Sequence, residues 1–398
     1  NYRSIEGEKM QEKTLDVVVY GATGYTGKLV VEYLLNQYGK GGDFKWAIAG
    51  RNQEKLNNII EEFELGSEVP AITADGNDIQ SLETMVQQAK CILTTAGPYQ
   101  LYGSNLVKAC AENGTDYVDL CGEPAWMHRM IEEHSDKANQ TGARIVFSCG
   151  FDSIPFDLGV YFLQEKVKSK VGNTSTAIRG RVRAMNGEFS GGTALSMTST
   201  MASLKEKPEL IEILANPFSL ANGFQGPEQP NDSKPQFDEK LETWVAPFFM
   251  APINSKNIHR SNALLNHSYG KEFTYNEMWI QGPGDEGKAA AELISKVNPL
   301  ENAPKPGEGP SKEARENGNY DILFCADLDN GSSMHASVTG DLDPGYGSTS
   351  KMIAESAICL IQDCADLTGG IYTPAASMGS KLISRLEASA GLRFSEEN

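Results

Sequence analysis

Three glycines near the start of the chain have the spacing of a turn that binds phosphate. They belong to a segment that follows an apolar run at 15–20 and opens a stretch of helical periodicity. In a strand–turn–helix context, such glycines permit a tight turn, close approach of the backbone to a diphosphate, and close packing of the helix on the strand. The segment therefore predicts that backbone N–H groups hold the diphosphate of a dinucleotide. Its residues are Gly21, Ala22, Thr23, Gly24, Tyr25, Thr26 and Gly27.

The residues after the second apolar run indicate which dinucleotide binds. Gly50-Arg51-Asn52 stands where NAD-binding domains place an acidic residue for the ribose 2′-hydroxyl. A carboxylate repels a 2′-phosphate, whereas the Arg51 guanidinium pairs with it through charge-assisted hydrogen bonds. The sequence therefore predicts NADP(H), with Lys55 supporting the same phosphate. The alternative is that Arg51 and Asn52 only serve the start of a solvated helix, where Asn52 suits an N-cap.

Further candidate residues follow the third, fourth and fifth apolar runs. Asp75 is placed to meet the adenine or its ribose, although a plain turn role fits its position equally well. In a doubly wound sheet, the nicotinamide falls over the turns after the fourth and fifth strands. The residues expected there are Ala96, Gly97, Pro98 and Tyr99, followed by Cys121 and Gly122.

Reduction of a polarised double bond by a hydride also requires a proton donor. By position, the candidate catalytic residues are Tyr99, Cys121 and Asp152, with Tyr102 as a further phenol. Each of the three has a structural alternative. Tyr99 could simply cover the nicotinamide, Cys121 could be a small buried residue, and Asp152 could cap the next helix. The sequence has no Ser-His-Asp order, paired-carboxylate pattern or phosphate-transfer loop, so hydrolase and kinase activities are unsupported.

The elements that must position these residues alternate along the first 150 residues. Such alternation of short apolar runs with amphipathic stretches is the βαβ pattern of a parallel sheet. The predicted fold class is α/β, with an N-terminal Rossmann doubly wound sheet, a second mixed α+β domain, and C-terminal helices that return to the first domain. Strands are expected at 15–21, 45–51, 71–76, 91–97, 117–122 and 144–150, and helices at 28–37, 53–63, 79–90, 103–113 and 126–141.

The pattern divides the chain into a leader and three parts. Residues 1–9 precede Met10 and are expected to be foreign to the native chain, and 10–150 form the NADP-binding domain. Residues 151–345 are expected to form a substrate and dimerisation domain, with strands near 175–185, 320–328 and 332–342 and a helix starting at Ser190 or Gly191. Within it, 221–240 and 298–319 are rich in Pro, Gly and charge and predict mobile loops. Residues 346–398 predict a helical segment that packs on the Rossmann domain.

Composition excludes several classes of partner. The formal net charge of −18 argues against nucleic acid, because phosphate backbones require clustered Lys and Arg. Seven scattered cysteines without a CxxC pair predict a reduced, cytoplasmic protein and no metal site. No apolar run is long enough to predict a transmembrane segment.

Five segments give the chain a recognisable family character: GATGYTG (21–27), TTAGPYQLYG (94–103), GTDYVDLCGE (114–123), FSCGFDSIPFDLG (147–159) and, more thinly, GGIYTPAASMG (369–379). Together they resemble the saccharopine dehydrogenase-like oxidoreductases, and within them the trans-acting enoyl reductase group. The resemblance implies an NADP-binding Rossmann domain, and a second domain that supplies substrate contacts and a homodimer surface. In mycobacterial members it implies reduction of an enoyl double bond during assembly of complex lipids. Other members are associated with lipid surfaces, so peripheral lipid association is left open.

Three functions are compatible with these features. The first is NADP(H)-dependent reduction of an enoyl bond in a small-molecule, acyl or lipid-like substrate. The second is saccharopine-type imine chemistry, whose carboxylated substrates need an Arg cluster. Arg179, Arg181 and Arg183 share one strand face, where a solvated edge is an equally good interpretation. The third is a cofactor-binding protein without catalysis that acts at lipid surfaces, for which the apolar segment 242–253 is the only sequence support. A place in the core of the second domain is the preferred interpretation of that segment.

Overall fold

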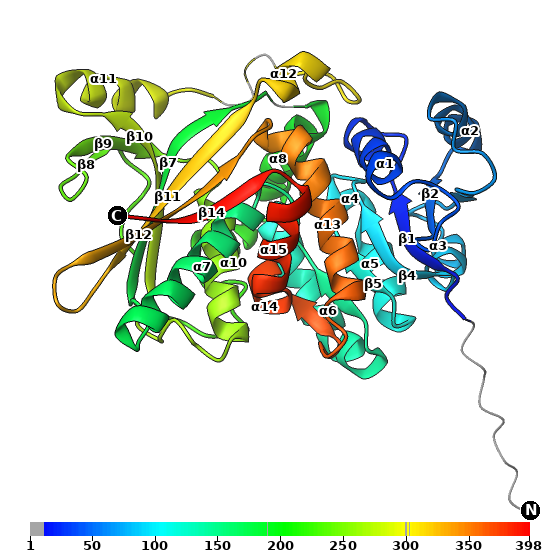
Figure 1. Ribbon diagram of the computed structural model, residues 1–398, viewed down its shortest axis with the longest axis horizontal. Helices are drawn as coiled ribbons and strands as arrows, with labels where there is room; N and C mark the ends of the chain where they lie inside the picture. Colours follow the sequence, from blue (N-terminus) through cyan, green and yellow to red (C-terminus); the bar gives the residue numbers. More distant parts are fainter. Residues whose placement is uncertain (1–11, 189, 299–300, 302) are drawn as a thin grey trace, which may run out of the picture.

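The computed structural model describes residues 12–188, 190–298, 301 and 303–398. Two seven-stranded sheets lie side by side, with a layer of helices between them (Figure 1). The leader at 1–9 lies outside the described residues, so the expectation about it stays a prediction.

The first sheet is wholly parallel, with the order β13-β6-β5-β4-β1-β2-β3. Its six N-terminal strands have the 3-2-1-4-5-6 order of a doubly wound dinucleotide-binding sheet, so the predicted fold class is confirmed. Chain order reverses between β1 and β4, and the ligand crevice of such a sheet lies beyond the carboxyl ends of these two strands. The strands are β1 (Leu15–Tyr20), β2 (Trp46–Gly50), β3 (Ala71–Thr73), β4 (Ala89–Thr94), β5 (Asp116–Val118), β6 (Arg144–Val146) and β13 (Gly370–Tyr372).

Crossover helices pack on this sheet through their periodic apolar residues. Val30, Val31 and Leu34 of the first helix are fully buried. Asn52 and Asp78 cap two helices by accepting backbone N–H groups of the first turn. The helices are α1 (Tyr25–Tyr38), α2 (Gln53–Glu62), α3 (Ile79–Val86), α4 (Tyr99–Tyr102), α5 (Ser104–Glu112) and α6 (Pro124–Thr141).

The second sheet is mixed, with the order β14-β12-β11-β7-β10-β9-β8. One of its faces packs against α7 (Ile154–Val171) and α10 (Ala251–Leu264), where Ile178, Val182 and Phe324 join the main core. The strands are β7 (Ala177–Asn186), β8 (Gln236–Asp238), β9 (Thr243–Pro247), β10 (Thr274–Gly282), β11 (Asn319–Asp327), β12 (Ser333–Gly340) and β14 (Leu392–Glu397). The remaining helices are α8 (Gly191–Glu206), α9 (Leu210–Ala215), α11 (Gly284–Ile294) and α12 (Lys312–Glu316).

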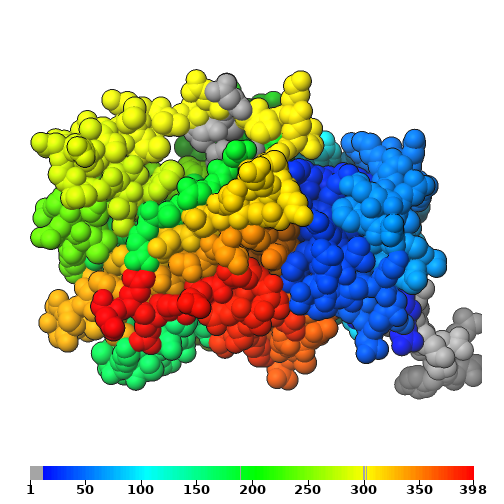
Figure 2. All heavy atoms as spheres, turned by 45° about the horizontal axis from the view of Figure 1, so that its top comes forward, coloured from blue at the N-terminus to red at the C-terminus, as the bar shows by residue number. Residues whose placement is uncertain are grey.

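The C-terminal segment returns to the first domain, as predicted. Figure 2 shows its red and orange atoms against the blue atoms of the first domain. Helix α13 (Thr349–Gln362) packs on α1 and β4, and is preceded by a π-helical turn, η1 (Pro344–Ser348). The segment is not only helical, however, because besides α14 (Pro374–Ser377) and α15 (Gly379–Ser389) it adds β13 to the first sheet and β14 to the second.

Two segments differ from the sequence-based expectations, and a third decides between two interpretations. The expected loop 221–240 ends in β8, and 298–319 contains α12, although 299–300 and 302 lie outside the described residues. The apolar segment 242–253 is mainly core rather than an exposed patch, because Val245, Phe248 and Ile253 are buried. The lipid-surface interpretation therefore loses its support from this segment.

Candidate active site

The three glycines of the 21–27 turn have three different structural roles. Gly21 has φ +89°, and a Cβ there would lie 3.1 Å from the Ala96 nitrogen. A Cβ on Gly27 would overlap the Gly21 carbonyl oxygen, so helix and strand can approach only with glycine at this position. A Cβ on Gly24 would meet nothing closer than the Gly21 oxygen at 3.4 Å, and Gly24 is exposed. The protein therefore leaves the space in front of Gly24 open.

The start of α1 is suited to an anion. No side chain caps this helix, and its first turn carries no acidic residue. The first backbone N–H groups of a helix lack intrahelical partners and carry partial positive charge, so an uncapped start attracts a diphosphate. The turn therefore fits the diphosphate of a dinucleotide by its geometry as well as by its glycine spacing.

The residues after β2 leave a guanidinium free. Asn52 caps α2, since its Oδ1 accepts a hydrogen bond from the Lys55 nitrogen at 2.9 Å. The Arg51 and Lys55 side chains are exposed and make no hydrogen bond or ion pair within the described part of the chain. They are available to a 2′-phosphate. Asp75 closes its own turn instead, because its Oδ1 accepts the Asn77 N–H at 2.9 Å.

Tyr25, the first residue of α1, is held by the second domain. Its hydroxyl donates to the Pro310 carbonyl at 2.5 Å and accepts from Arg315 Nη1 at 2.9 Å. The Tyr346 ring packs edge-on against it, with centroids 5.2 Å apart. These contacts join the glycine turn to segments more than 280 residues away along the chain. The second domain therefore packs against the start of α1.

The turn after β4 is anchored from below by Tyr99. The Tyr99 hydroxyl donates to the Thr94 carbonyl at 3.3 Å and accepts the Leu120 N–H at 3.0 Å, and its ring packs against Trp126. Burial raises the pKa of this phenol well above its usual value. The side chain points into the core, which favours a positioning role over proton donation.

Cys121 and its neighbour Glu123 join the turns after β4 and β5. The Cys121 thiol is fully buried and accepts the Glu123 N–H at 3.4 Å, and burial raises its pKa, so it stays neutral. The Glu123 carboxylate accepts the N–H groups of Tyr99 at 3.0 Å and Gln100 at 2.9 Å, which caps α4. We assigned no role to Glu123 from the sequence, since only the fold brings its carboxylate to that helix start.

Asp152 lies at the same edge of the sheet, in the loop after β6. Its Oδ2 stands directly over the α-carbon of Gly122, where a Cβ would overlap it. Burial is the largest cause of a pKa raised to about 7, and the charge of Asp119 adds to it. The carboxyl lies half-buried beside the turn that is expected to lie under the nicotinamide. With this raised pKa, it can hold a proton there near neutral pH.

A helix of the second domain, α8, lies opposite these turns. Ser196 of α8 hydrogen-bonds the Glu123 carboxylate, and its Oγ lies 3.5 Å from where a Cβ of Gly97 would be. Further along α8, the Ser203 hydroxyl donates to Gln100 Oε1 at 2.7 Å. The sequence predicted α8 and its start but not that it covers the turns after β4 and β5.

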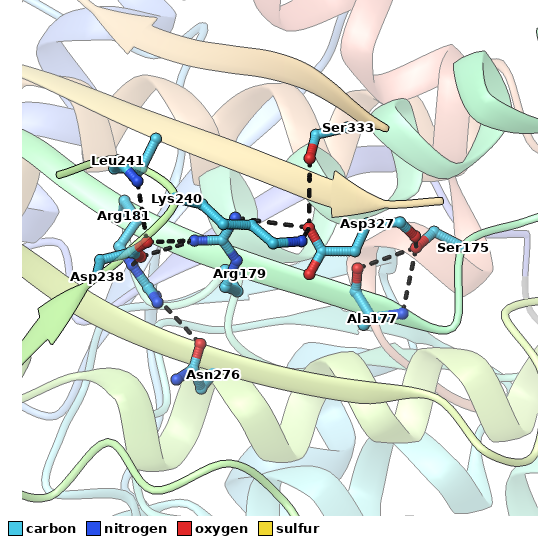
Figure 3. Close-up of polar contacts among 10 residues, drawn as sticks. All are labelled: Ser175, Ala177, Arg179, Arg181, Asp238, Lys240, Leu241, Asn276, Asp327 and Ser333. Atoms are coloured by element: carbon cyan, nitrogen blue, oxygen red, sulfur yellow. Dashed lines mark hydrogen bonds and ion pairs between the residues drawn. The ribbon is translucent and has the colours of Figure 1, made fainter. Parts of the chain in front are cut away.

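The three arginines of β7 do not converge on this crevice. They alternate with Ile178 and Val182 and therefore face away from the α7 and α10 layer. Figure 3 shows Arg179 and Arg181 pointing to Asp238, at 2.7 and 2.8 Å. Arg183 pairs with Asp321 at 2.8 Å and with Glu397. Their charge is neutralised by carboxylates of the chain itself.

The described residues contain neither a metal-binding cluster nor a membrane-spanning helix. No group of three or more His, Cys, Asp or Glu side chains among them could hold a metal ion. In the same part of the chain, no helix combines the length and the apolar character that crossing a membrane requires.

Comparisons with known proteins agree with this site. Residues 17–146 match the family model of the saccharopine dehydrogenase NADP binding domain. A Mycobacterium tuberculosis protein, provisionally named a trans-acting enoyl reductase, is 37% identical over 94% of this chain and 96% of its own length. The trans-acting enoyl reductase of Mycobacterium leprae is 33% identical over 96% of this chain and 97% of its own.

Solved structures support the fold at low sequence identity. The apo saccharopine dehydrogenase (L-Glu forming) of Saccharomyces cerevisiae superposes with a TM-score of 0.54 at 11% identity, covering 96% of this chain and 100% of that one. The homospermidine synthase of Legionella pneumophila, in complex with NAD, has the same TM-score and identity, covering 96% and 91%. The chain therefore belongs to the saccharopine dehydrogenase-like oxidoreductases, within the group of the trans-acting enoyl reductases, and binds NADP(H).

Proposed function

We propose that this oxidoreductase reduces the enoyl C=C bond of an acyl or lipid-like substrate. One observation carries the substrate class: the narrow cavity between α6 and the α8–α9 pair, beside Gln100 and Glu123, is lined mainly by apolar side chains, with leucines of α8 and α9 facing Pro124 and Trp126 of α6. A conjugated acyl chain suits such a wall. A carboxylated imine requires free guanidinium groups, and those of Arg179, Arg181 and Arg183 are paired elsewhere.

The chain's residues would divide the chemistry as follows. When bound, NADPH supplies a hydride to the β-carbon of the enoyl group. Asp152 then delivers its proton to the α-carbon and is left as a carboxylate, which regains a proton from solvent, so that charge and atoms balance. Gly97 would leave room for the ring, and Gly122 admits the Asp152 carboxyl, while Tyr99 and Glu123 hold both turns in place.

The test is a substrate screen under single-turnover and steady-state conditions. Purified protein with NADPH is mixed with trans-2-enoyl pantetheine thioesters, and in parallel with 2-oxo acids plus amines that form imines. We expect NADPH oxidation with the enoyl thioesters, with the saturated thioester identified by mass. Oxidation only with the imine mixtures would overturn the substrate class, and tight NADPH binding without oxidation of any substrate would favour a non-catalytic role.

Cofactor preference gives a separate prediction for Arg51. Replacing Arg51 with alanine should weaken NADPH binding about 10- to 100-fold, because a charge-assisted pair with the 2′-phosphate is lost. NADH binding should stay unchanged, since NADH lacks that phosphate. Titration of both cofactors by fluorescence measures the two affinities, and Lys45→Ala, on the exposed amino-terminal side of β2, is the control. Equal losses for NADPH and NADH would contradict the assignment.

A further inference from the structure

A narrow cavity lies between α6 and the α8–α9 pair. Its volume is about 20 Å³, room for roughly one water molecule. Leu204 of α8 and Leu210 and Leu214 of α9 form one wall, and Pro124 and Trp126 of α6 form the other. Gln100 and Glu123 lie at its inner end, next to the turn that carries Gly97. The cavity is therefore an apolar slot that begins beside Gln100 and Glu123, the residues next to the turns after β4 and β5.

The α8–α9 pair that covers this slot is anchored at its two ends, and between them it is held by the hydrogen bonds of Ser196 and Ser203 and by few buried apolar contacts. At the α8 end, the Gly191 N–H donates to the Glu308 carbonyl at 3.0 Å, and the Thr193 hydroxyl bonds the Tyr346 hydroxyl at 2.7 Å. At the α9 end, buried Lys256 donates from Nζ to the Leu214 carbonyl at 2.7 Å. Within the two helices, only Gly191 is buried. Segments with so few buried apolar contacts open at low free-energy cost.

Exposed apolar side chains gather around the same cover. Among the described residues, Leu101 of α4, Met201 of α8 and Ile211 of α9 are 55%, 56% and 55% exposed. A cluster of large, exposed apolar side chains often marks a binding site for an apolar ligand or partner. Their position around the slot fits the approach of a hydrocarbon chain.

The inner end of the slot carries an unpartnered hydrogen-bond donor. Within the described part of the chain, Gln100 Nε2 is buried and has no hydrogen-bond acceptor, while its Oε1 accepts from the Ser203 hydroxyl. A buried amide N–H without an acceptor is unfavourable, and an acceptor supplied by a ligand would remove that cost. A thioester carbonyl at the head of an acyl chain is such an acceptor.

From this geometry we infer that the slot beneath α8–α9 binds the acyl chain of a thioester, with the Gln100 amide donating to its carbonyl. The α8–α9 pair parts from α6 to admit the chain. This inference rests on the proposed function for the identity of the thioester, but its binding step does not depend on reduction. A carbonyl held there would also be polarised by the Gln100 N–H as negative charge develops on it.

The experiment measures binding of saturated thioesters, which cannot be reduced. Butanoyl- and dodecanoyl-pantetheine are titrated by calorimetry into the full chain saturated with NADP⁺, so that neither probe competes at the nucleotide site. We expect the dodecanoyl thioester to bind at least about 100-fold more tightly, since each buried methylene adds favourable transfer free energy. Leu204→Trp should fill the slot and remove most of this difference, leaving the butanoyl affinity within about threefold. Ala202→Trp, at an exposed position of the same helix outside the lining of the slot, is the matched control and should change neither.

Each outcome decides one claim. Equal affinities for the two thioesters in the unaltered protein, or equal losses in the two Trp variants, would overturn the acyl slot. Chain-length dependence that Leu204→Trp removes, in a protein that reduces no enoyl thioester, would uphold the slot and overturn the proposed reaction. Gln100→Leu should weaken both thioesters alike, because it removes the carbonyl donor and leaves the leucine wall intact. Unchanged affinity in that variant would overturn the role of Gln100.

Discussion

Replacement of Gly24 by valine is expected to abolish NADPH binding in a protein that remains folded. The residue has φ −79° and ψ 169°, extended values that valine adopts readily, and a Cβ meets only the Gly21 oxygen at 3.4 Å. The branched side chain would instead fill the space in front of the uncapped start of α1. Loss of about two charge-assisted hydrogen bonds to the diphosphate predicts an affinity at least about 100-fold lower. Fluorescence titration with NADPH and a thermal unfolding curve measure the two properties.

The neighbouring glycine is the control for this result. Gly27→Ala should lower the unfolding temperature, because its Cβ would overlap the Gly21 carbonyl oxygen. Gly24→Val should leave that temperature within a few degrees of the unaltered protein. Normal NADPH affinity in folded Gly24→Val would place the diphosphate elsewhere.

Local sequence patterns predicted the first domain well. Apolar runs that end in glycine located β1 and β2 to within a residue at each end, because strands buried on both faces leave a continuous apolar signal. Strands β5 and β6 are shorter than predicted for a physical reason. The Asp119 carboxylate accepts the N–H groups of Cys121 and Ser148, both at 2.9 Å. These side-chain hydrogen bonds replace the backbone hydrogen bonds between strands where the chain turns.

Features that depend on distant contacts escaped the sequence analysis. Helix α10 has no apolar stripe, because its buried polar side chains pair with distant groups: Asn257 donates to the Ser153 hydroxyl and Ser261 to Asp157. Two further features could not be predicted for the same reason: the hydrogen bonds between Tyr25 and the second domain, and the position of α8 over the Gly97 turn. The open glycine turn and the exposed position of Arg51 could be predicted, because each depends only on its own strand end.

The choice among the three candidate proton donors turns on solvent access and hydrogen bonding. The Tyr99 hydroxyl is committed to two backbone partners, and the Cys121 thiol is fully buried. The Asp152 carboxyl is half-buried, stands over Gly122, and has a pKa raised to about 7 by burial. Of the three, it alone combines partial exposure with a pKa near neutral, and we therefore propose it as the proton donor.

Asp152→Asn should therefore lower kcat about 100-fold or more, the usual contribution of a positioned general acid, and leave NADPH affinity unchanged. In the unaltered protein, kcat should fall as pH rises through about 7, where the carboxyl loses its proton. The residual activity of the variant should lack this transition. Stopped-flow measurement of NADPH oxidation between about pH 5.5 and 9, a range that extends more than about one pH unit to either side of the transition, resolves both profiles. A variant with unchanged kcat would remove Asp152 from the reaction.

Stability supplies a readout of the same proton that needs no substrate. Folding raises the pKa of Asp152 from its ordinary 3.8 to about 7, so between these pH values the folded chain binds more protons than the unfolded chain. The contribution of Asp152 to stability must then decline as pH rises from 4 to 7, and stay constant above. Asparagine does not titrate, so the unfolding temperature of Asp152→Asn relative to the unaltered protein should increase over that interval and then level off. Asp157 titrates in both proteins and cancels in the comparison, whereas Asp119 raises the pKa of Asp152 and is coupled to it. The same comparison made in an Asp119→Asn background separates the two carboxyls. A difference that does not vary with pH would show that Asp152 is ionised in the folded protein, and would leave the reaction without its proton.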